Sequence, residues 1–598
     1  MAVAGLLDKQ RLTSIAIVEA EVISKFRGAR PLAERELAAH GKQFIAGWQL
    51  PELLNSSTHQ LHLLLPEGFP FSRPRVAVDP AGPVLKWPHL EERGLLCVAP
   101  DEAPHPPEDP AASVVHAIER AQTLVNDCIE GRGFEQFEDE FVSYWNRWAQ
   151  ARQPVRSLCH PDGPSRPVRA WFGKSFTVIA EDDASLRAWL EGFFDKKMER
   201  GNFTPRDMPF IWLEKVPRPA DYPGNVDALL RLVQSDDQSE ALLSTLLQDQ
   251  ASSNKTVLLG CRTRHGVGLG AIRILKPQAH RGGGDPLTKG GFRGMPPKDV
   301  LLARYSAAPV VGANVIRCDP LWVHGRDHNS AVGVLLTKSV MILGVGSVGS
   351  SVATLLAKSG VGKITLVDPQ AIQSENTSRH ELGANSVENG KATQLAASLR
   401  QRFPHLTILA EEKSWQEFVR VKPEQLTSGD LVISTMGSWS QESELNAAVL
   451  QLPSSRPILY GWTEPHATAG HAVVFNDQAA CLRCLTDELG ELRTPVTSWS
   501  GDTTKQIPAC GGSFQPYGAV ELEHTIALIA ELALDALAEE VRASTHRVWI
   551  GRRHVLERAG GHWNPRWIEA NLDPDDGGRI VVLGVSGDAQ CPTCKAKA

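Results

Sequence analysis

The chain of 598 residues lacks several features that mark common protein classes. No apolar run approaches the roughly 18 residues needed to cross a bilayer, and Met1 to Thr13 lacks the basic segment and apolar core of a secretory signal. No cluster of Lys and Arg forms a polybasic arm, and the formal net charge is −7. We therefore expect a cytoplasmic protein with no membrane and no nucleic acid among its partners.

Cysteine is scarce as well, with 10 residues in the chain. In a reducing compartment, so few thiols are better interpreted as metal ligands, nucleophiles or core residues than as disulfides. Their spacing therefore carries more information than their number. At a typical domain length of roughly 150 residues, the chain should hold several cores.

Residues 1–150 combine short strand patterns with a long amphipathic helix. The helix should follow a proline-rich loop, Pro100 to Pro110, and Cys128 falls on its apolar face, which makes that cysteine a core residue. The expected strands are 42–48, 59–65 and 75–78.

Residues 151–310 show mixed helix and strand patterns but no chemical motif. A glycine-rich stretch, 281–294, lacks the Lys-Ser/Thr ending of a P-loop, so we interpret it as a mobile loop and assign it no ligand. One helix is expected to carry Leu229, Leu232, Val233, Leu242 and Leu246.

From Ser339 onward strand and helix patterns alternate, which predicts a parallel sheet covered by helices on both faces. The apolar run 339–343 leads into Gly344, Gly346 and Gly349, spaced as GxGxxG, and then into an apolar helix. Glycines permit a tight turn and close backbone approach, and free amides at the helix start attract phosphate.

A second strand, 363–367, ends at Asp368, at the distance expected for an acid that hydrogen-bonds a ribose hydroxyl. Together with the glycine turn, this acid predicts an adenine-nucleotide site. A nicotinamide-dependent oxidoreductase would use the same pattern, so the neighbouring residues must decide between the two nucleotides.

Those neighbours resemble the ThiF-like adenylating fold of ubiquitin-activating enzymes, from about Arg326 to the C-terminus. That family joins a glycine turn and an aspartate to an Asn-x-x-Arg element and a downstream lysine, matched here by Asn376, Arg379 and Lys391. The resemblance implies that Asp368 holds the ribose of ATP, while the other three residues surround its phosphates.

The same resemblance implies that Arg326 is an additional phosphate-binding arginine and that Mg²⁺ accompanies the nucleotide. The family's further acid is expected near Met436 or Gly437, where this sequence has none. How Mg²⁺ is held therefore stays open.

Two CxxC pairs, Cys481 with Cys484 and Cys591 with Cys594, predict a tetrahedral structural site for Zn²⁺. Between them lies Cys510, in Pro508-Ala-Cys-Gly-Gly, flanked by small residues. A thiolate is well suited to accept an adenylated carboxylate as a thioester. The resemblance to adenylating enzymes favours this role over that of a buried apolar residue.

Phe69-Pro-Phe-Ser-Arg-Pro74, Trp87-Pro-His89 and the following Cys97 resemble a ubiquitin-conjugating domain. The resemblance covers roughly residues 1–150 and implies an α+β fold with Cys97 as the thioester nucleophile. His89 stands where that family has asparagine, and it can donate a hydrogen bond to the oxyanion formed when a lysine amine attacks. Trp87 replaces the family's first histidine.

The expected architecture is therefore α/β and multidomain. It comprises an α+β ubiquitin-conjugating-like domain (1–150), a mixed α/β intervening domain (151–310) and a Rossmann-like ThiF adenylation domain (311–598). Tethering the two active domains raises the effective concentration of each thioester for the other. The expected reaction adenylates a protein C-terminus, passes it from Cys510 to Cys97, and conjugates it to a lysine.

This domain order is similar to the fusion protein associated with CD-NTases in bacterial CBASS antiphage operons. Further residues of the kind found there are Phe137 to Phe141 with Tyr144 and Trp145, and Tyr460 to Glu464 with Gly470 and His471. The resemblance implies that the C-terminal tail of a partner CD-NTase is activated and that the chain forms a homodimer.

Three other functions stay open on the sequence. An activator of a ubiquitin-like or sulfur-carrier protein would keep the ATP, zinc and Cys510 chemistry. A nucleotide-binding scaffold without conjugation activity is favoured by the missing acid near Gly437. An NAD-dependent oxidoreductase is the third, and it would require a nicotinamide cofactor.

Overall fold

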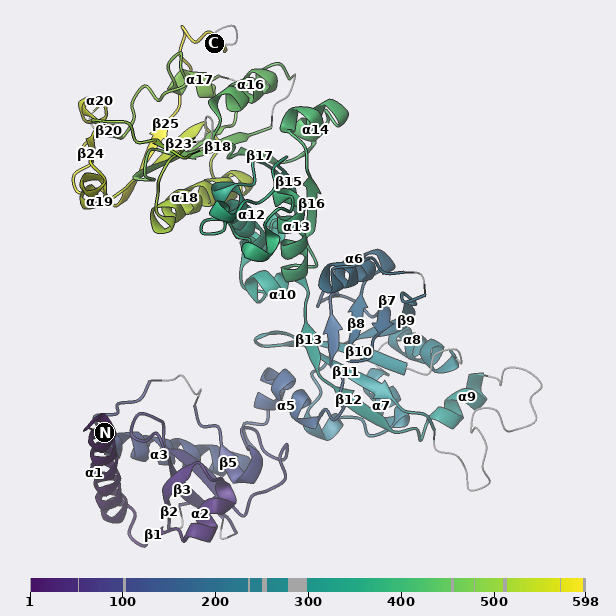
Figure 1. The fold of residues 1–598 in the computed structure, drawn as a ribbon. Helices are drawn as coiled ribbons and strands as arrows, with labels where there is room; N and C mark the ends of the chain where they lie inside the picture. Colours follow the sequence, from purple (N-terminus) through teal and green to yellow (C-terminus); the bar gives the residue numbers. More distant parts are fainter. Residues whose placement is uncertain are drawn as a thin grey trace. The chain divides into compact units, whose positions relative to one another are not determined.

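The computed structural model describes residues 2–51, 53–56, 58–99, 104–199, 201–234, 237–249, 255–277, 298–452, 456–477, 479–508, 513–570 and 572–594. Its contacts divide the chain into two compact units. The first comprises Met1–Arg156, His160–Val178 and Arg206–Ile316, and the second comprises Ser157–Cys159, Ile179–Pro205 and Arg317–Ala598. Figure 1 colours both along the chain. No described helix has the length and apolar character to cross a membrane.

The N-terminal part of the first unit is an antiparallel sheet packed against helices α1 and α3. Leu61, Leu63 and Leu65 alternate along β3 and enter the same core as Cys128 of α3, which is 5% exposed, as expected. The expected strands all form. The elements are α1 (Ala2–Lys25), β1 (Arg30–Pro31), α2 (Glu34–His40), β2 (Phe44–Gln49), β3 (Gln60–Pro66), β4 (Arg75–Asp79), η1 (Glu92–Gly94), β5 (Leu95–Leu96) and α3 (Pro110–Ile129), with sheet order β1-β2-β3-β4-β5.

The first unit continues through two helices, α4 (Gln136–Asp139) and α5 (Phe141–Trp148), into a second sheet. The strand order is β12-β11-β10-β9-β7-β8-β6-β13. The first five strands in this order belong to the first unit, whereas β8, β6 and β13 each contain a boundary between the two units. The strands are β6 (Val155–Ser157), β7 (Arg166–Phe172), β8 (Thr177–Ala180), β9 (Arg206–Leu213), β10 (Lys255–Thr263), β11 (Gly266–Ile274), β12 (Val310–Ala313) and β13 (Val315–Arg317).

The prediction of a single helix over 229–246 is wrong, because two helices form there. Each has its own buried face, and acids at Asp237 and Glu240 in the first turn of the second are typical of a helix start. The glycine-rich stretch 281–294 lies outside the described residues. The helices are η2 (Pro219–Asp221), α7 (Val226–Val233), α8 (Asp237–Gln248) and α9 (Lys298–Tyr305).

The second unit contains the predicted parallel sheet, extended by strands that were not expected. Strands β16, β15, β14, β17 and β18 are parallel, whereas β19, β23 and β25 continue the sheet in antiparallel order. The strands are β14 (Ser339–Leu343), β15 (Lys363–Val367), β16 (Thr407–Glu411), β17 (Leu431–Ser434), β18 (Ile458–Thr463), β19 (Ala469–Phe475), β23 (Thr545–Ile550) and β25 (Arg579–Gly584).

Helices cover both faces of this sheet, as predicted (Figure 1). Along β14, Val340 and Ile342 pack on the side of α12, α13 and α18, whereas Met341 and Leu343 pack on the side of α14 and α16. The alternation follows from the two-residue period of a strand. These helices are α12 (Ser347–Ser359), α13 (Lys391–Arg402), α14 (Trp415–Val421), α16 (Trp439–Leu450) and α18 (Ala519–Leu537).

Shorter elements complete the second unit. The helices are α6 (Asp183–Phe194), α10 (Pro320–Gly325), α11 (Ser330–Leu335), η3 (Ser374–Asn376), η4 (Ala384–Ser386), α15 (Gln425–Ser428), α17 (Leu482–Leu485), α19 (Arg553–Arg558) and α20 (Pro565–Glu569). Two small sheets pair β20 (Thr497–Trp499) with β24 (Gly561–Trp563) and β21 (Lys505–Gln506) with β22 (Ser513–Phe514).

Candidate functional sites

The glycine turn lies between β14 and α12, at the carboxyl edge of the parallel strands. Gly344 has φ +87°, and a Cβ on Gly349 would lie 1.9 Å from the Gly344 carbonyl oxygen, so both positions require glycine. By contrast, a Cβ on Gly346 would meet nothing within 4 Å. Gly346 is the N-cap of α12, so this open space adjoins the helix start, where the first amides have no partner within the helix. The turn is therefore shaped for an anionic group to approach the backbone.

Asp368 follows β15 directly and is 5% exposed. Its carboxylate accepts hydrogen bonds from the amides of Val345, in the glycine turn, and Gln370, at 2.7 and 2.8 Å. His380 braces the same turn, because its Nε2 donates to the Val345 carbonyl at 2.9 Å while its Nδ1 accepts from the Leu382 amide. Asp368 is thus fixed beside the glycine turn, as the sequence predicted.

Lys391 opens α13 and is buried. Its Nζ donates to Oε1 of Gln370 at 2.7 Å, which joins it to the loop that follows Asp368. An ammonium has three N–H donors, so this bond leaves capacity for a phosphate oxygen. Asn376 sits at the end of η3, where its Oδ1 accepts from the Gln373 amide at 3.1 Å.

Arg379 is connected to Asn376 by the backbone bond from its amide to the Asn376 carbonyl, 2.9 Å. Its guanidinium carbon lies 4.6 Å from the ring centroid of Tyr517, just before α18. The Arg379 Nε is buried and has no hydrogen-bond partner among the described residues. Because a buried donor without a partner is costly, this atom is suited to a bound anion.

The acid expected near Met436 or Gly437 is supplied by no residue of that loop, but a buried carboxyl lies next to it. Glu442, on α16, accepts from the Ser434 hydroxyl at 2.8 Å. Burial raises the pKa of Glu442 to about 7, against hydrogen bonds from Ser434 and from the Gly437 and Met436 amides. Glu442 therefore shapes the loop after β17, a role for which the sequence offered no local signal.

Arg326 lies away from the glycine turn of its own chain. It is the C-cap of α10, and the neighbouring His324 donates from Nδ1 to the Lys358 carbonyl at 2.9 Å, near the last turn of α12. The glycine turn is at the first turn of α12, and 13 helical residues span roughly 20 Å. The structure thus does not bring Arg326 together with Asp368, Arg379 and Lys391 within one chain.

The two CxxC pairs meet in one cluster. The Sγ–Sγ separations are 4.0 Å for Cys481–Cys484, 3.7 Å for Cys481–Cys591 and 3.4 Å for Cys484–Cys594. Four thiolates around Zn²⁺ at about 2.3 Å would be about 3.8 Å apart, so the spacing fits this metal. Burial acts to raise the pKa of Cys591, but hydrogen bonds from the amides of Cys594 and Thr593 outweigh it and lower the pKa to about 7. The cluster, with all four cysteines buried, can hold zinc.

Cys510 lies outside the described residues, but the segment that leads to it is anchored. Glu464 is buried and accepts from the amides of Val496 and Thr497 at 2.7 and 2.8 Å. His471 Nε2 lies 3.0 Å from the same carboxylate. Burial acts to raise the pKa of Glu464, but the pKa is held below its ordinary value. The hydrogen bond from His471 is the largest of the effects that lower it.

Cys97 and His89 are brought together in the first unit. Cys97 follows β5 and is half-buried, and its amide donates to the His89 carbonyl at 2.9 Å. Its Sγ lies 3.9 Å from the Ala99 carbonyl oxygen. His89 has φ +58°, a left-handed conformation that is uncommon for residues other than glycine, although histidine adopts it more often than most. Trp87 is buried against the ring of His59.

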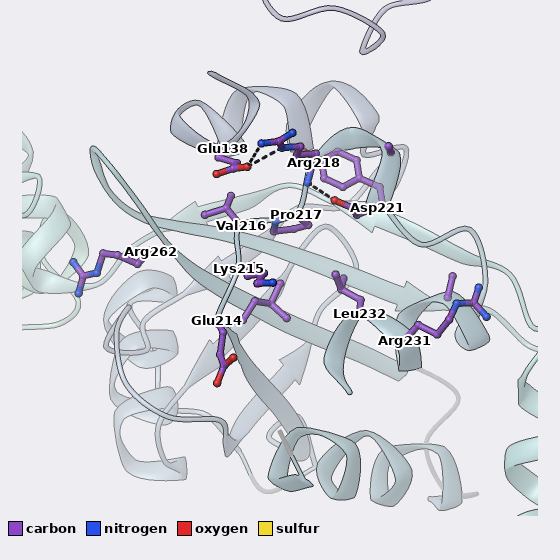
Figure 2. A pocket seen from close by; sticks show the side chains of 14 residues that line it. Glu138, Glu214, Lys215, Val216, Pro217, Arg218, Asp221, Arg231, Leu232 and Arg262 are labelled. Carbon is purple, nitrogen blue, oxygen red and sulfur yellow. Dashed lines mark hydrogen bonds and ion pairs between the residues drawn. The ribbon is translucent and has the colours of Figure 1, made fainter. Parts of the chain in front are cut away.

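A cavity of about 1100 Å³ lies in the first unit beside the turn that follows β9 (Figure 2). Its wall is polar and internally paired: Glu138 forms an ion pair with Arg218 at 2.6 Å, and Asp221 accepts from the Arg218 amide. None of the predicted catalytic, nucleotide or metal residues is among those that line it. We assign it no ligand.

Comparison with known proteins matches two parts of the chain to family models. Residues 20–153 match the prokaryotic E2 family B, and residues 329–537 match the ThiF family. The predicted combination of a ubiquitin-conjugating-like domain and a ThiF-like domain is thereby confirmed. The predicted boundaries at residues 150 and 310 stay predictions.

Several relatives are named ATP-dependent ubiquitin transferase-like protein Cap2. The protein of that name from Pseudomonas aeruginosa (strain BWHPSA011 / Pa011) is 25% identical over 502 residues, which cover 78% of this chain and 83% of the relative. The Vibrio cholerae protein (serotype O1, strain ATCC 39315 / El Tor Inaba N16961) is 27% identical over 43% of this chain and 44% of its own length.

Among solved structures, a crystal structure of Escherichia coli MccB with succinimide has a TM-score of 0.32 and 14% identity, over 45% of this chain and 68% of that chain. A likeness of this size supports no conclusion. The chain joins a prokaryotic E2 family B domain to a ThiF family domain, and it is a transferase of the ubiquitin-activating and ubiquitin-conjugating kind.

Proposed function

We propose that the chain activates the C-terminus of a protein with ATP, carries it as a thioester on Cys510 and then on Cys97, and conjugates it to a lysine. The observation that carries the proposal is the pairing of two sites in one chain. Asp368 is bonded to the glycine turn and Lys391 to the loop that follows Asp368, and Cys97 is bonded to the backbone of His89.

In the first step, a carboxylate oxygen of the substrate protein attacks the α-phosphorus of ATP. The bond to pyrophosphate breaks, and an acyl adenylate forms. Asp368 would hold the ribose, while Asn376, Arg379 and Lys391 would surround the phosphates and offset the charge on the leaving pyrophosphate. The buried Nε of Arg379 supports this role, because it lacks a partner among the described residues. Mg²⁺ would accompany the phosphates.

Two thioesters follow. The Cys510 thiolate attacks the acyl carbon and AMP leaves; the Cys97 thiolate then attacks the Cys510 thioester, and Cys510 leaves as a thiolate. A lysine amine finally attacks the Cys97 thioester, the C–N bond forms and the C–S bond breaks. Zn²⁺ bound by Cys481, Cys484, Cys591 and Cys594 would tie residues near the C-terminus to the ThiF domain rather than take part in this chemistry.

The substrate we propose is the C-terminal tail of a partner CD-NTase, in an antiviral role. The support is the similarity of the domain order to the CBASS fusion proteins, together with the Cap2 relatives. Other protein tails, such as those of ubiquitin-like or sulfur-carrier proteins, are the alternatives.

The test is to incubate the protein with ATP, Mg²⁺ and candidate tails, and to follow adducts on non-reducing gels. We expect a thiol-sensitive adduct that is lost in Cys510→Ala, whereas Cys97→Ala retains the Cys510 adduct and loses conjugation. Cys318→Ala, outside both sites, is the matched control and should behave as the wild type. If nucleotide binds but no tail forms an adduct, the scaffold function replaces this proposal.

We also propose that the chain works as a homodimer in which Arg326 serves the nucleotide site of the second copy. Its place at the far end of α12 from the glycine turn supports this. Mixing Arg326→Ala with Lys391→Ala tests it, because a mixed dimer would contain one site with both residues intact. Recovery of adenylation on mixing is expected; the absence of recovery contradicts the shared site.

A further inference from the structure

The conjugating site is held by a helix that lies well beyond it in the sequence. The Tyr144 hydroxyl, on α5, accepts a hydrogen bond from the His89 amide at 2.9 Å. From the next turn of α5, Arg147 donates to the Leu90 carbonyl at 3.0 Å and lies 3.7 Å from the Glu91 carboxylate. The short segment from His89 to Glu91 is therefore fixed by α5.

The backbone of His89 is held on both sides. Tyr144 takes its N–H, and the Cys97 amide donates to its carbonyl. A left-handed conformation is unfavourable for a residue with a side chain, so it persists where the surroundings enforce it. Because one of these bonds leads directly to Cys97, the same contacts that fix His89 also fix the nucleophile.

Glu140 approaches the imidazole of His89 from the junction of α4 and α5. Its Oε2 lies 3.8 Å from Nδ1 of His89. The pKa of Tyr144 is raised first by burial and further by the charge of Glu140, so the phenol keeps its proton. Tyr144 thus holds the backbone of His89 while Glu140 faces its imidazole.

This arrangement bears on which nitrogen of His89 carries the proton. An Nδ1–H directed at the Glu140 carboxylate leaves Nε2 of the neutral ring as an acceptor. An acceptor can take a proton from an attacking amine, and a carboxylate 3.8 Å away stabilises the positive charge that the ring then acquires. A donor to an oxyanion, the role expected from the sequence, would need the opposite tautomer.

We propose that Glu140 and Tyr144 are positioning residues that prepare His89 to act as general base when an amine attacks the Cys97 thioester. The inference rests on the proposed role of Cys97. In this step the amine nitrogen bonds to the acyl carbon, Cys97 leaves as a thiolate, and the amine proton passes to Nε2 of His89.

The adjoining face of α5 explains why these residues stay in place. Phe141 and Trp145 are fully buried in the core of the intervening sheet. A Cβ on Gly270 would lie 2.6 Å from the Trp145 ring, so glycine leaves the space that the indole fills. Trp145 Nε1 also donates to the Ala313 carbonyl at 3.2 Å. The intervening region thus takes part in the conjugating site.

The experiment measures one turnover of the full chain. The wild type and each variant are charged on Cys97 with ATP and a competent tail, excess free lysine is added, and loss of the thioester is followed. We expect Glu140→Gln to slow discharge by about 10-fold and Tyr144→Phe by about 5-fold. Glu138→Gln, on α4 two residues before Glu140 but paired with Arg218, is the matched control and should discharge at the wild-type rate.

His89→Asn separates the two possible roles of His89. Asparagine can donate to an oxyanion but cannot accept a proton at neutral pH, so a base role predicts slow discharge, by about 100-fold. In that background Glu140→Gln should have no further effect, since Glu140 acts through His89. A merely structural role for Glu140 would give additive losses.

The outcomes are distinguishable. Wild-type discharge rates in His89→Asn, or in Glu140→Gln, would overturn the inference and leave the thioester relay intact. If the wild type never forms a Cys97 thioester with a tail that is adenylated, the relay itself fails. Normal charging of Tyr144→Phe and Glu140→Gln with slowed discharge is the supporting result.

Discussion

The two proposed sites of this chain, for the nucleotide and for conjugation, are built in different ways. At the nucleotide site, the glycine turn and Asp368 follow neighbouring parallel strands, and Asp368 bonds directly to the turn through the Val345 amide. At the conjugating site, the backbone of His89 depends on Tyr144, 55 residues further along. A site at the edge of a parallel sheet can be recognised from short motifs, whereas a site completed by a distant helix cannot.

The largest effect that would test this contrast comes from Trp145→Ala. Replacing a fully buried tryptophan leaves a cavity and should lower the free energy of unfolding of the first unit by about 4 kcal/mol. Because α5 then loses its anchor, discharge of the Cys97 thioester should fall, while ATP–pyrophosphate exchange at the ThiF domain stays unchanged. Chemical denaturation and the two activity assays measure both effects.

Val142→Ala is the control, since Val142 lies on the same helix and is 38% exposed. This substitution should change the free energy of unfolding by no more than about 0.5 kcal/mol, and it should leave the rate of thioester discharge unchanged. If Trp145→Ala destabilises the unit but leaves discharge intact, the conjugating site does not depend on α5.

The same contrast explains what the sequence could predict. The strands at 339–343 and 363–367 form with the expected limits, because apolar runs and a glycine turn are local signals. The antiparallel strands β19, β23 and β25 and the division of α7 from α8 were missed, since both depend on tertiary contacts. Tyr144 stood out in the sequence by resemblance, but its bond to His89 spans too many residues to predict.

Glu442, like the nucleotide motifs, depends on local contacts, because its partners lie within eight residues of it. A carboxyl whose pKa rises from 4.5 to about 7 on folding destabilises the folded state when ionised, by about 3 kcal/mol. The folded state keeps a proton that the unfolded chain releases above pH 4.5, so stability falls as pH rises from 4.5 to about 7. Glu442→Gln should remove this loss, as measured by denaturation of the second unit between pH 4.5 and pH 8.

Glu444→Gln is the matched control, since Glu444 is exposed on the same helix, where Gln416 donates to it. Its stability should follow the wild-type pH dependence. An unchanged pH dependence in Glu442→Gln would mean that the Glu442 carboxyl is not protonated in the folded loop.

Tyr517→Leu has the smallest expected effect and bears most directly on how far the nucleotide site is local. The Tyr517 ring faces the Arg379 guanidinium at 4.6 Å and enters from the segment that follows Cys510. A cation–π contact contributes about 1 kcal/mol, so the apparent affinity for ATP should fall about 5-fold. Tyr517→Phe keeps the ring and should bind ATP as the wild type does, in an equilibrium titration of each variant.

A 5-fold loss of ATP affinity in Tyr517→Leu but not in Tyr517→Phe would show that a distant segment also contributes to the nucleotide site. The contrast between the two sites would then be one of degree: distant contacts adjust a nucleotide site already formed by its motifs, but they are required to form the conjugating site. Equal affinities in both variants would keep the nucleotide site local, because Arg379 would then need no support from beyond Cys510. A loss of ATP affinity far above 5-fold would instead mean that Tyr517 contacts the nucleotide directly. The segment that follows Cys510 would then form part of the nucleotide site.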